Sequence, residues 1–389
     1  MTLVAHGISR EASRPSRPRA WRGPVRAEAP MIAVLARMAE QTGAPPTRLL
    51  GEFASLALGA GRLTFTDYAR LRLYDDAFWA GADKKTVIGE RRNRDICQTI
   101  NQHRDGGLFA NRLATAAYLG AFGFPVPGVV ATFAKGVAAP GPRLLRGRGD
   151  LRQFLAAGSA YPLFASPIER KSHRARIITG FDRASEMLEF AGGARAALDS
   201  YIDDVSECER FLFQEAPAPH PFLAALAGSR LAPVSLVTLT AEDEPRVLRA
   251  AWRIPVDDTV GRKTRRGDLL ARVDFRSGAV LRVTRGLGLD LEEVTRHPTT
   301  GARLIGATVP DWQSLKATAI EAARATRPLA LIGWEVAPCA SGPMILGATE
   351  TPDLSLGQLV DRKGLLDADF CAFLADHRQT SADGPLASA

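Results

Sequence analysis

The sequence predicts an α+β protein in which a helical region comes first and a largely antiparallel sheet region follows. Apolar residues recur at helical spacing from Met31 onward. From Tyr161 the chain instead shows short apolar and β-branched runs, several of them joined by tight turns such as residues 276–278. With 389 residues, of which 46% are hydrophobic, the chain is long enough to bury a sizeable core.

The composition argues against several classes of protein. No apolar run approaches the roughly 20 residues that a membrane helix needs, and residues 1–30 lack the apolar core of a secretory signal. The four cysteines, Cys97, Cys208, Cys339 and Cys371, form no C-x-x-C pair, so neither a zinc site nor a disulfide framework is indicated. We therefore expect a cytoplasmic protein with no membrane partner.

Half of the formal charge of +8 lies in residues 1–30, where six arginines stand against two glutamates. Four prolines and few apolar residues predict that this segment is a disordered basic tail. Its arginines are not interleaved with aromatic residues, so nucleic acid is not expected as a partner. Weak binding of anions is one interpretation of such a tail, and a solvated arm without a partner, or a misassigned start codon, is the interpretation that we favour.

Helices and strands can be assigned in order along the chain. Helical spacing appears in Ile32–Met38 and Leu49–Leu58, and Thr64 is placed to cap a third helix. A further helix precedes Pro125, after which a strand begins. The later strands are predicted at 162–166, 175–181, 211–215, 234–240, 246–256, 269–275 and 279–284. Helices are expected from 312 to 327, capped by Asp311, and from 367 to 377.

Between these last helices, residues 329–354 predict a hairpin. An apolar run through Gly333-Trp334-Glu335 meets a turn at Ser341-Gly342, and a second apolar run leads to an acidic loop. Such a hairpin brings Glu335 towards the carboxylates that follow its second strand, Glu350 and Asp353. Carboxylates so placed can hold a hard cation such as Mg²⁺ against phosphate oxygens.

Several segments together resemble the ATP-grasp superfamily, in the branch of sugar-transfer-associated and α-L-glutamate ligase-related proteins. These segments read LTFTDYARLRLYD (63–75), NRLATAAYLGAFGFPVP (111–127), FLFQE (211–215), RHPTTGARLIGATVPDW (296–312), GWEVA (333–337) and GPMILGATETPDL (342–354). The resemblance implies an ATP-grasp-like fold with nucleotide clamped between two sheet-bearing lobes. It divides the chain into a tail (1–30), a helical region (31–105), an ATP-grasp-like domain (106–366) and a C-terminal helix and tail (367–389).

The resemblance also implies an activity, in which a carboxylate is joined to an amine through an acyl phosphate while ATP becomes ADP. The expected partners are thus ATP, Mg²⁺ and small carboxylate and amine substrates. Gln214 and Glu215 match the residues that hold adenine. Arg253 matches the arginine of the family's next strand and is the expected catalytic residue. Lys171, or else Arg174 or Arg176, can replace the phosphate-binding lysine, and Lys171 is the one we assign. Glu335, with Glu350 as a substitute partner, would bind the metal.

The chain departs from this branch at positions that carry the chemistry. Ser166-Pro167 stands where the family has Lys-Pro, and the segment after it has no glycine before Gly180 to form a phosphate loop. Residues 347–349 read Gly-Ala-Thr where the branch carries Glu-Gly-Asn as metal ligands. A catalytically degenerate binding or scaffolding protein in a sugar-polymer or peptide-modification pathway is therefore an alternative to an active ligase.

Three tryptophans and one histidine are expected to have structural roles. Trp252, Trp312 and Trp334 are expected in the core or between the lobes instead of serving as platforms for a substrate. His297 resembles the His-Pro of the family, and for it we expect a structural hydrogen bond instead of a catalytic role.

Overall fold

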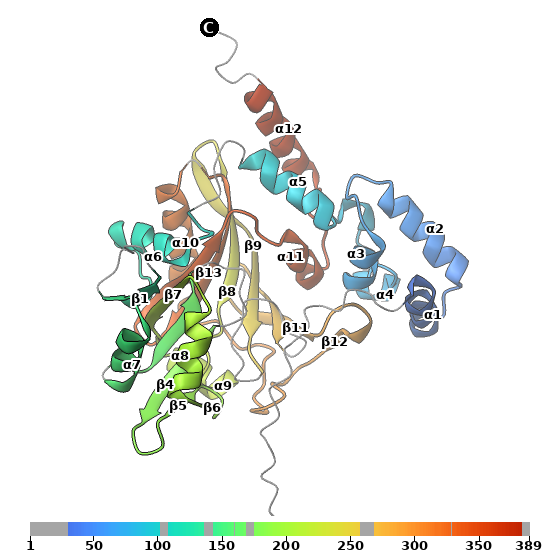
Figure 1. Ribbon diagram of the computed structural model, residues 1–389. Helices are drawn as coiled ribbons and strands as arrows, with labels where there is room; N and C mark the ends of the chain where they lie inside the picture. Colours follow the sequence, from blue (N-terminus) through green and yellow to red (C-terminus); the bar gives the residue numbers. More distant parts are fainter. Residues whose placement is uncertain are drawn as a thin grey trace, which may run out of the picture.

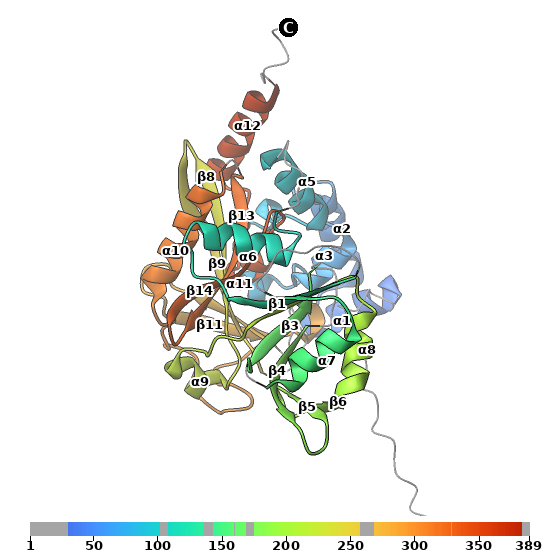
Figure 2. The same cartoon turned by 60° about the vertical axis from the view of Figure 1, so that its left-hand side comes forward.

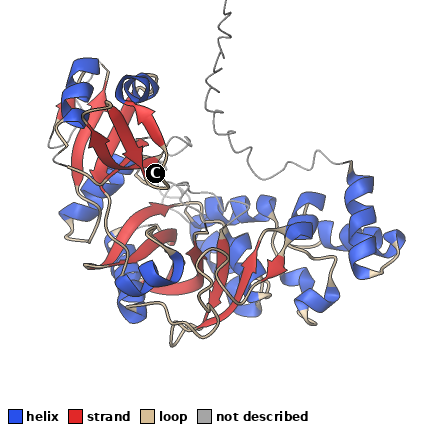
Figure 3. Ribbon diagram, turned by 90° about the horizontal axis from the view of Figure 1, so that it is seen from below, coloured by secondary structure: helices blue, strands red, loops and turns tan. Residues whose placement is uncertain are grey.

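Two seven-stranded sheets and a group of N-terminal helices make up the part of the chain that the computed structural model describes (Figure 1). The structure describes residues 30–101, 108–135, 143–158, 160–168, 175–256, 268–327 and 329–382, with side chains to residue 375. Seen from below, the sheets form two separate groups of strands, and the N-terminal helices lie beside one of them (Figure 3). This confirms the predicted α+β class, with two sheet-bearing lobes and a helical N-terminal region.

The N-terminal helices form where apolar residues recur at helical spacing. They are α1 (Met31–Thr42), α2 (Pro46–Ala57), α3 (Phe65–Arg70), α4 (Asp76–Trp79), η1 (Lys84–Thr86) and α5 (Glu90–Ile100). Thr64 caps α3 as predicted, because its hydroxyl accepts a hydrogen bond from Asp67 N while the Asp67 carboxylate accepts one from Thr64 N. The apolar faces of α1 to α4 bury a shared core that includes Met38, Tyr68 and Trp79.

The first sheet has the strand order β2-β1-β7-β3-β4-β5-β6. Its strands are β1 (Val129–Ala134), β2 (Leu144–Leu145), β3 (Leu163–Pro167), β4 (Arg176–Asp182), β5 (Met187–Phe190), β6 (Arg195–Ala197) and β7 (Arg210–Glu215). Helices α7 (Arg148–Ala156) and α8 (Leu198–Ser206) pack together over one face, which holds Phe211 and Phe213 (Figure 2). Because side chains alternate along a strand, Leu212 and Gln214 of β7 lie on the opposite face.

The second sheet is antiparallel throughout, with the order β12-β11-β10-β9-β8-β13-β14. Its strands are β8 (Val234–Ala241), β9 (Glu244–Ile254), β10 (Leu269–Val273), β11 (Val280–Arg285), β12 (Glu292–Glu293), β13 (Leu331–Cys339) and β14 (Gly342–Thr349). Helix α10 (Trp312–Ala325) packs on one face, which buries Trp252 and Trp334, and α11 (Leu354–Asp361) packs on the other. The remaining helices are α6 (Arg112–Ala121), α9 (Pro221–Ala227), η2 (Gly288–Asp290) and α12 (Ala368–Ala382).

A buried amide on α11 joins the second sheet to the helical region. Gln358 Oε1 accepts hydrogen bonds from Ile88 N at 2.9 Å and from Leu365 N at 3.1 Å, and Gln358 Nε2 donates to Ile88 O at 3.1 Å. Beside it, Thr86 O accepts from both Leu365 N and Leu366 N. The Gln358 side chain is fully buried, so water cannot replace these bonds.

Each of the seven strands predicted after residue 161, and the hairpin, is confirmed in place. Our reading missed β5, β6, α8, α9 and α11, which are short. The predicted cap of α10 is wrong: Asp311 precedes the helix, but its side chain accepts no hydrogen bond from it. A capping residue normally has an extended backbone, whereas Asp311 is left-handed with φ 51°. The predicted tail lies outside the described residues except for Pro30.

No disulfide joins the four cysteines. Burial raises the pKa of Cys97 to about 12 and that of Cys339 to about 11, so both are protonated thiols at neutral pH. Among the described residues, no helix has both the length and the apolar character that crossing a bilayer requires.

Replacing Gln358 by alanine is expected to lower the free energy of unfolding by about 3 kcal/mol, because buried groups of Ile88 and Leu365 lose their partners. The matched control is Gln313→Ala, which removes an exposed hydrogen bond from Gln313 Nε2 to Arg276 O and should cost about 0.5 kcal/mol. Urea unfolding measures both values. Equal losses in the two variants would contradict the role assigned to Gln358.

Stability should fall at alkaline pH through Tyr74. Its hydroxyl donates to Gln41 Oε1 at 2.9 Å, and burial raises its pKa from 10.0 to about 12. As the pH rises, the unfolded chain therefore loses the Tyr74 hydroxyl proton before the folded chain does. The contribution of this group to the free energy of unfolding is complete below pH 10 and is lost between pH 10 and 12, at up to about 1.4 kcal/mol per pH unit. Urea unfolding between pH 8 and 11 should show a shallower decline in Tyr74→Phe than in the parent chain.

Candidate functional site

A cavity of about 150 Å³ lies between the two sheets. Its walls come from the ends of strands in both lobes, from the start of α6 and from the segment that follows β7. The lining residues used below are Arg112, Phe164, Ile177, Gln214, Glu215, Arg230, Arg253, Asp268, Glu335 and Leu346. Four of the six residues that the sequence nominated, Gln214, Glu215, Arg253 and Glu335, are thereby brought together.

The end of β7 supplies one wall. Gln214 Nε2 donates to Pro127 O at 3.2 Å, and Glu215 N donates to Gly128 O at 2.9 Å. A Cβ atom at position 128 would lie 2.9 Å from the Glu215 carboxylate, so glycine there lets the side chain of Glu215 lie against the backbone. These contacts hold Gln214 and Glu215 at the mouth of the first lobe.

Ser166 lies on the same face of the first sheet. Along β3, Leu163 and Ala165 point into the core under α7 and α8, so Phe164 and Ser166 point to the cavity side. Ser166 is 1% exposed, and its Oγ has no hydrogen-bond partner among the described residues. This small hydroxyl occupies the position at which the resemblance places a lysine.

In the second lobe, Arg253 and Glu335 face the cavity because their neighbours are core residues. Trp252 and Trp334 are buried on the α10 face, where their Nε1 atoms donate to Ala232 O and to Thr238 Oγ1, each at 2.9 Å. The next residue on each strand therefore points the other way. Arg253 Nη1 and Glu335 Oε1 form an ion pair at 3.8 Å, with the side chains 13% and 24% exposed.

A bulge in β14 shapes the wall beside Glu335. Glu335 pairs with Gly347, and Val336 pairs with Ile345, so Leu346 is the extra residue between them. The bulge turns Leu346 into the cavity. On its other side, Glu335 pairs with Ser235 of β8, so neither neighbouring strand places a carboxylate opposite it.

Glu350 lies further along the hairpin. Asn101 Nδ2 donates to both Leu331 O, at 2.7 Å, and Glu350 O, at 3.0 Å, which places the backbone of Glu350 beside Leu331. Thr349 pairs with Gly333, so Glu350 comes next beside Ile332, three residues from Glu335 on β13, about 10 Å at the usual strand rise. Glu350 does not line the cavity in the described structure. Lys171 lies outside the described residues.

A family model for sugar-transfer associated ATP-grasp proteins matches residues 91–371, which is well over half of the chain. The chain belongs to this family. No curated protein matches the sequence.

Among solved structures, the chain is similar to N5-carboxyaminoimidazole ribonucleotide synthetase in its ADP complex, with 13% identity and a TM-score of 0.37 over 66% of this chain and 52% of that one. The similarity to the Staphylococcus aureus N5-carboxyaminoimidazole synthetase with ADP has 9% identity and a TM-score of 0.35, over 69% of this chain and 52% of that one. The similarity to D-alanine–D-alanine ligase from Bacillus anthracis has 10% identity and a TM-score of 0.35, over 71% of this chain and 67% of that one. This chain thus spans about half the length of the first two proteins.

The described residues of this ATP-grasp protein do not fit the Mg²⁺ that the resemblance implies. Glu335 is paired with Arg253, and Gly347 stands opposite it on β14. Asp268 also lines the cavity, but it adjoins β10, three strand positions from β13, about 14 Å at the usual spacing. Within the described residues, no three His, Cys, Asp or Glu side chains gather where they could hold a metal ion.

Sequence reasoning missed three charged residues of the cavity, Arg112, Arg230 and Asp268. Arg112 follows Asn111, which caps α6, and its guanidinium lies 5.7 Å from the centre of the Phe164 ring. The pattern NRLAT indicates the start of a helix, but nothing local shows that its first side chain meets a strand residue 52 positions later. Asp268 directly precedes β10 and Arg230 lies between α9 and β8, and neither gives a local signal of its own.

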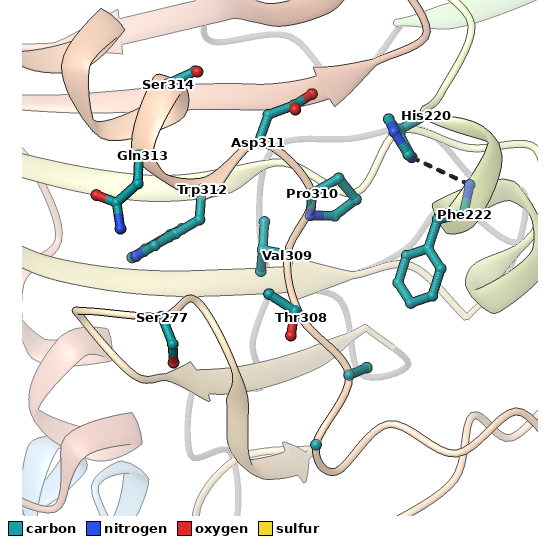
Figure 4. A pocket seen from close by; sticks show the side chains of 12 residues that line it. His220, Phe222, Ser277, Thr308, Val309, Pro310, Asp311, Trp312, Gln313 and Ser314 are labelled. Carbon is teal, nitrogen blue, oxygen red and sulfur yellow. Dashed lines mark hydrogen bonds between the residues drawn. The ribbon is translucent and has the colours of Figure 1, made fainter.

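A second, wider hollow of about 800 Å³ lies between α9, the turn at Ser277 and residues 306–314 (Figure 4). His220, the residue before α9, lies here. Its Nδ1 accepts a hydrogen bond from Phe222 N at 3.2 Å and so caps α9. His297 is likewise structural, as expected: its Nδ1 accepts from Thr300 N at 3.1 Å, and its Nε2 donates to Pro255 O at 2.8 Å.

The two histidines give a matched pair of variants. His297→Ala should lower the free energy of unfolding by about 3 kcal/mol, because a buried ring that binds backbone groups on both sides is lost. His220→Ala removes only a half-buried helix cap and should cost about 1 kcal/mol. Thermal and urea unfolding measure both. A smaller loss at position 297 than at position 220 would refute this assignment.

Proposed function

We propose that the cavity binds an adenine nucleotide, and that the chain is an ATP-dependent ligase that joins a carboxylate to an amine. One observation carries the proposal: the cavity between the two sheets brings together Gln214, Glu215, Arg253 and Glu335, which the family resemblance nominated independently. The family match supports nucleotide binding, and the residues of the cavity support its location.

The walls of the cavity offer two kinds of contact. Phe164, Ile177 and Leu346 give apolar surface for a base, next to the polar edge at Gln214 and Glu215. Arg253 supplies a guanidinium whose fork of donors matches phosphate oxygens, and Arg112 lines the same space. Lys171, outside the described residues, remains a predicted phosphate contact.

In the proposed reaction, a carboxylate oxygen attacks the terminal phosphorus of ATP and the bond to the bridging oxygen breaks, which releases ADP. The amine then attacks the carbonyl carbon of the acyl phosphate, loses a proton, and displaces phosphate. The contribution of Arg253 is to bind and orient the phosphates and to offset their charge. The cytoplasm, which holds ATP, remains the expected location.

A second candidate is a binding or scaffolding protein that keeps the nucleotide site without ligase turnover, in a sugar-polymer or peptide-modification pathway. Gly347 opposite Glu335, and Ser166 at the position of the family lysine, favour this candidate. Release of ADP by the purified chain in the presence of amino acids and amines supports the ligase. Binding of ATP without release of ADP supports the second candidate.

The purified chain should bind ATP with a dissociation constant below about 1 mM. Leu346→Trp fills the cavity and should weaken binding at least about tenfold, which corresponds to 1.4 kcal/mol. Leu281→Trp is the matched control, because Leu281 is 49% exposed on β11, away from the cavity. Calorimetry measures the affinities, and melting temperatures check the fold. No binding at millimolar ATP would exclude the proposed function.

A further inference from the structure

We infer that this site binds its nucleotide without a divalent cation, and that Arg253 exchanges its ion pair with Glu335 for the phosphates of the nucleotide. The inference rests on the nucleotide binding proposed above. It concerns how the phosphate charge is neutralised, and it starts from the disagreement between the cavity residues and a metal site.

A metal bridge between a hairpin and a triphosphate needs carboxylates that converge on one point. Glu335 has Gly347 on one side and Ser235 on the other, and both lack a carboxylate. By the usual strand spacings, the backbone of Glu350 lies about 10 Å along the strand and that of Asp268 about 14 Å across the sheet. Glu350 follows β14 and Asp268 precedes β10, so neither stands opposite Glu335 in the sheet.

The positive charge of Arg253, next to Glu335, also argues against a divalent cation at this position. Arg253 Nη1 lies 3.8 Å from Glu335 Oε1, and both side chains are largely shielded from water. The guanidinium already balances the charge of this carboxylate, so a divalent cation placed there would be repelled by Arg253. To recruit a metal, the site would have to move Arg253 away from the one acid that the metal needs.

The cavity has its own cations for a phosphate. Arg112, Arg230 and Arg253 line it, together with three acids, Glu215, Asp268 and Glu335. Arginine binds phosphate through two parallel hydrogen bonds, and it stays charged at any physiological pH. Arg253 itself lines the cavity proposed to hold the phosphates, so its side chain can turn from Glu335 to them.

The proposed exchange predicts that the substitution Glu335→Gln strengthens nucleotide binding. If Glu335 bound a metal, Glu335→Gln would weaken nucleotide binding. If Glu335 competes with phosphate for Arg253, the same isosteric change removes one acidic partner of the guanidinium and a negative charge beside the phosphates, and binding tightens. Arg253→Gln should weaken binding in either buffer, since it removes the cation itself.

The experiment measures ATP and ADP affinities by calorimetry for the full chain and both variants, in EDTA and in Mg²⁺, with melting temperatures as a check on folding. We expect affinities in EDTA within about threefold of those in Mg²⁺, three- to tenfold tighter binding for Glu335→Gln, and at least tenfold weaker binding for Arg253→Gln. Gln313→Ala, far from the cavity, serves as the unaltered control.

Binding that requires Mg²⁺, or that is lost in Glu335→Gln, would overturn the inference while leaving nucleotide binding intact. Unchanged affinity in Glu335→Gln would overturn the competition between Glu335 and phosphate. Absence of binding in both buffers would remove the proposed function, and the inference with it. The two failures are therefore distinguishable in one set of titrations.

Discussion

The burial of two indoles determines where the charged groups of the cavity lie. Trp252 and Trp334 occupy the α10 face of adjacent parts of the second sheet, and each has its Nε1 hydrogen-bonded inside the core. Because strand side chains alternate, Arg253 and Glu335 must then face the first sheet. A slip of either strand by one residue would expose an indole and bury a charge, so core packing and site geometry cannot change separately.

Much of the fold could be predicted from the sequence because its strands carry strong local signals. The runs at 211–215, 234–240 and 269–275 are apolar and β-branched between turn residues, and each forms a strand. Helix α11 was missed because its eight residues include Gly357 and show no long apolar period. A Cβ atom at position 357 would lie 3.3 Å from the Arg249 side chain, so α11 packs closely there. The left-handed backbone of Asp311 could not be predicted from its residue type, because aspartate is a favoured helix cap.

The side of the sheet on which a candidate residue lies could be predicted from the strand pattern, whereas contacts between distant segments could not. Gln214, Arg253 and Glu335 follow from their strands and from the family resemblance, and the cavity brings them together. The bulge at Leu346 and the placement of Glu350 by Asn101 depend on contacts between residues far apart in the chain. Residue counting along the hairpin therefore could not tell that the two glutamates are held apart.

The hydrogen bonds of the Gln358 amide limit where the chain can be truncated. The family match begins at residue 91, yet Gln358 binds Ile88, three residues before that point, and Thr86 pairs with Leu365 and Leu366. The buried contacts of α11 thus extend beyond the residues that the family model matches. A chain shortened to residues 91–371 would keep every nominated residue of the cavity and would still lose the interior surface on which α11 rests.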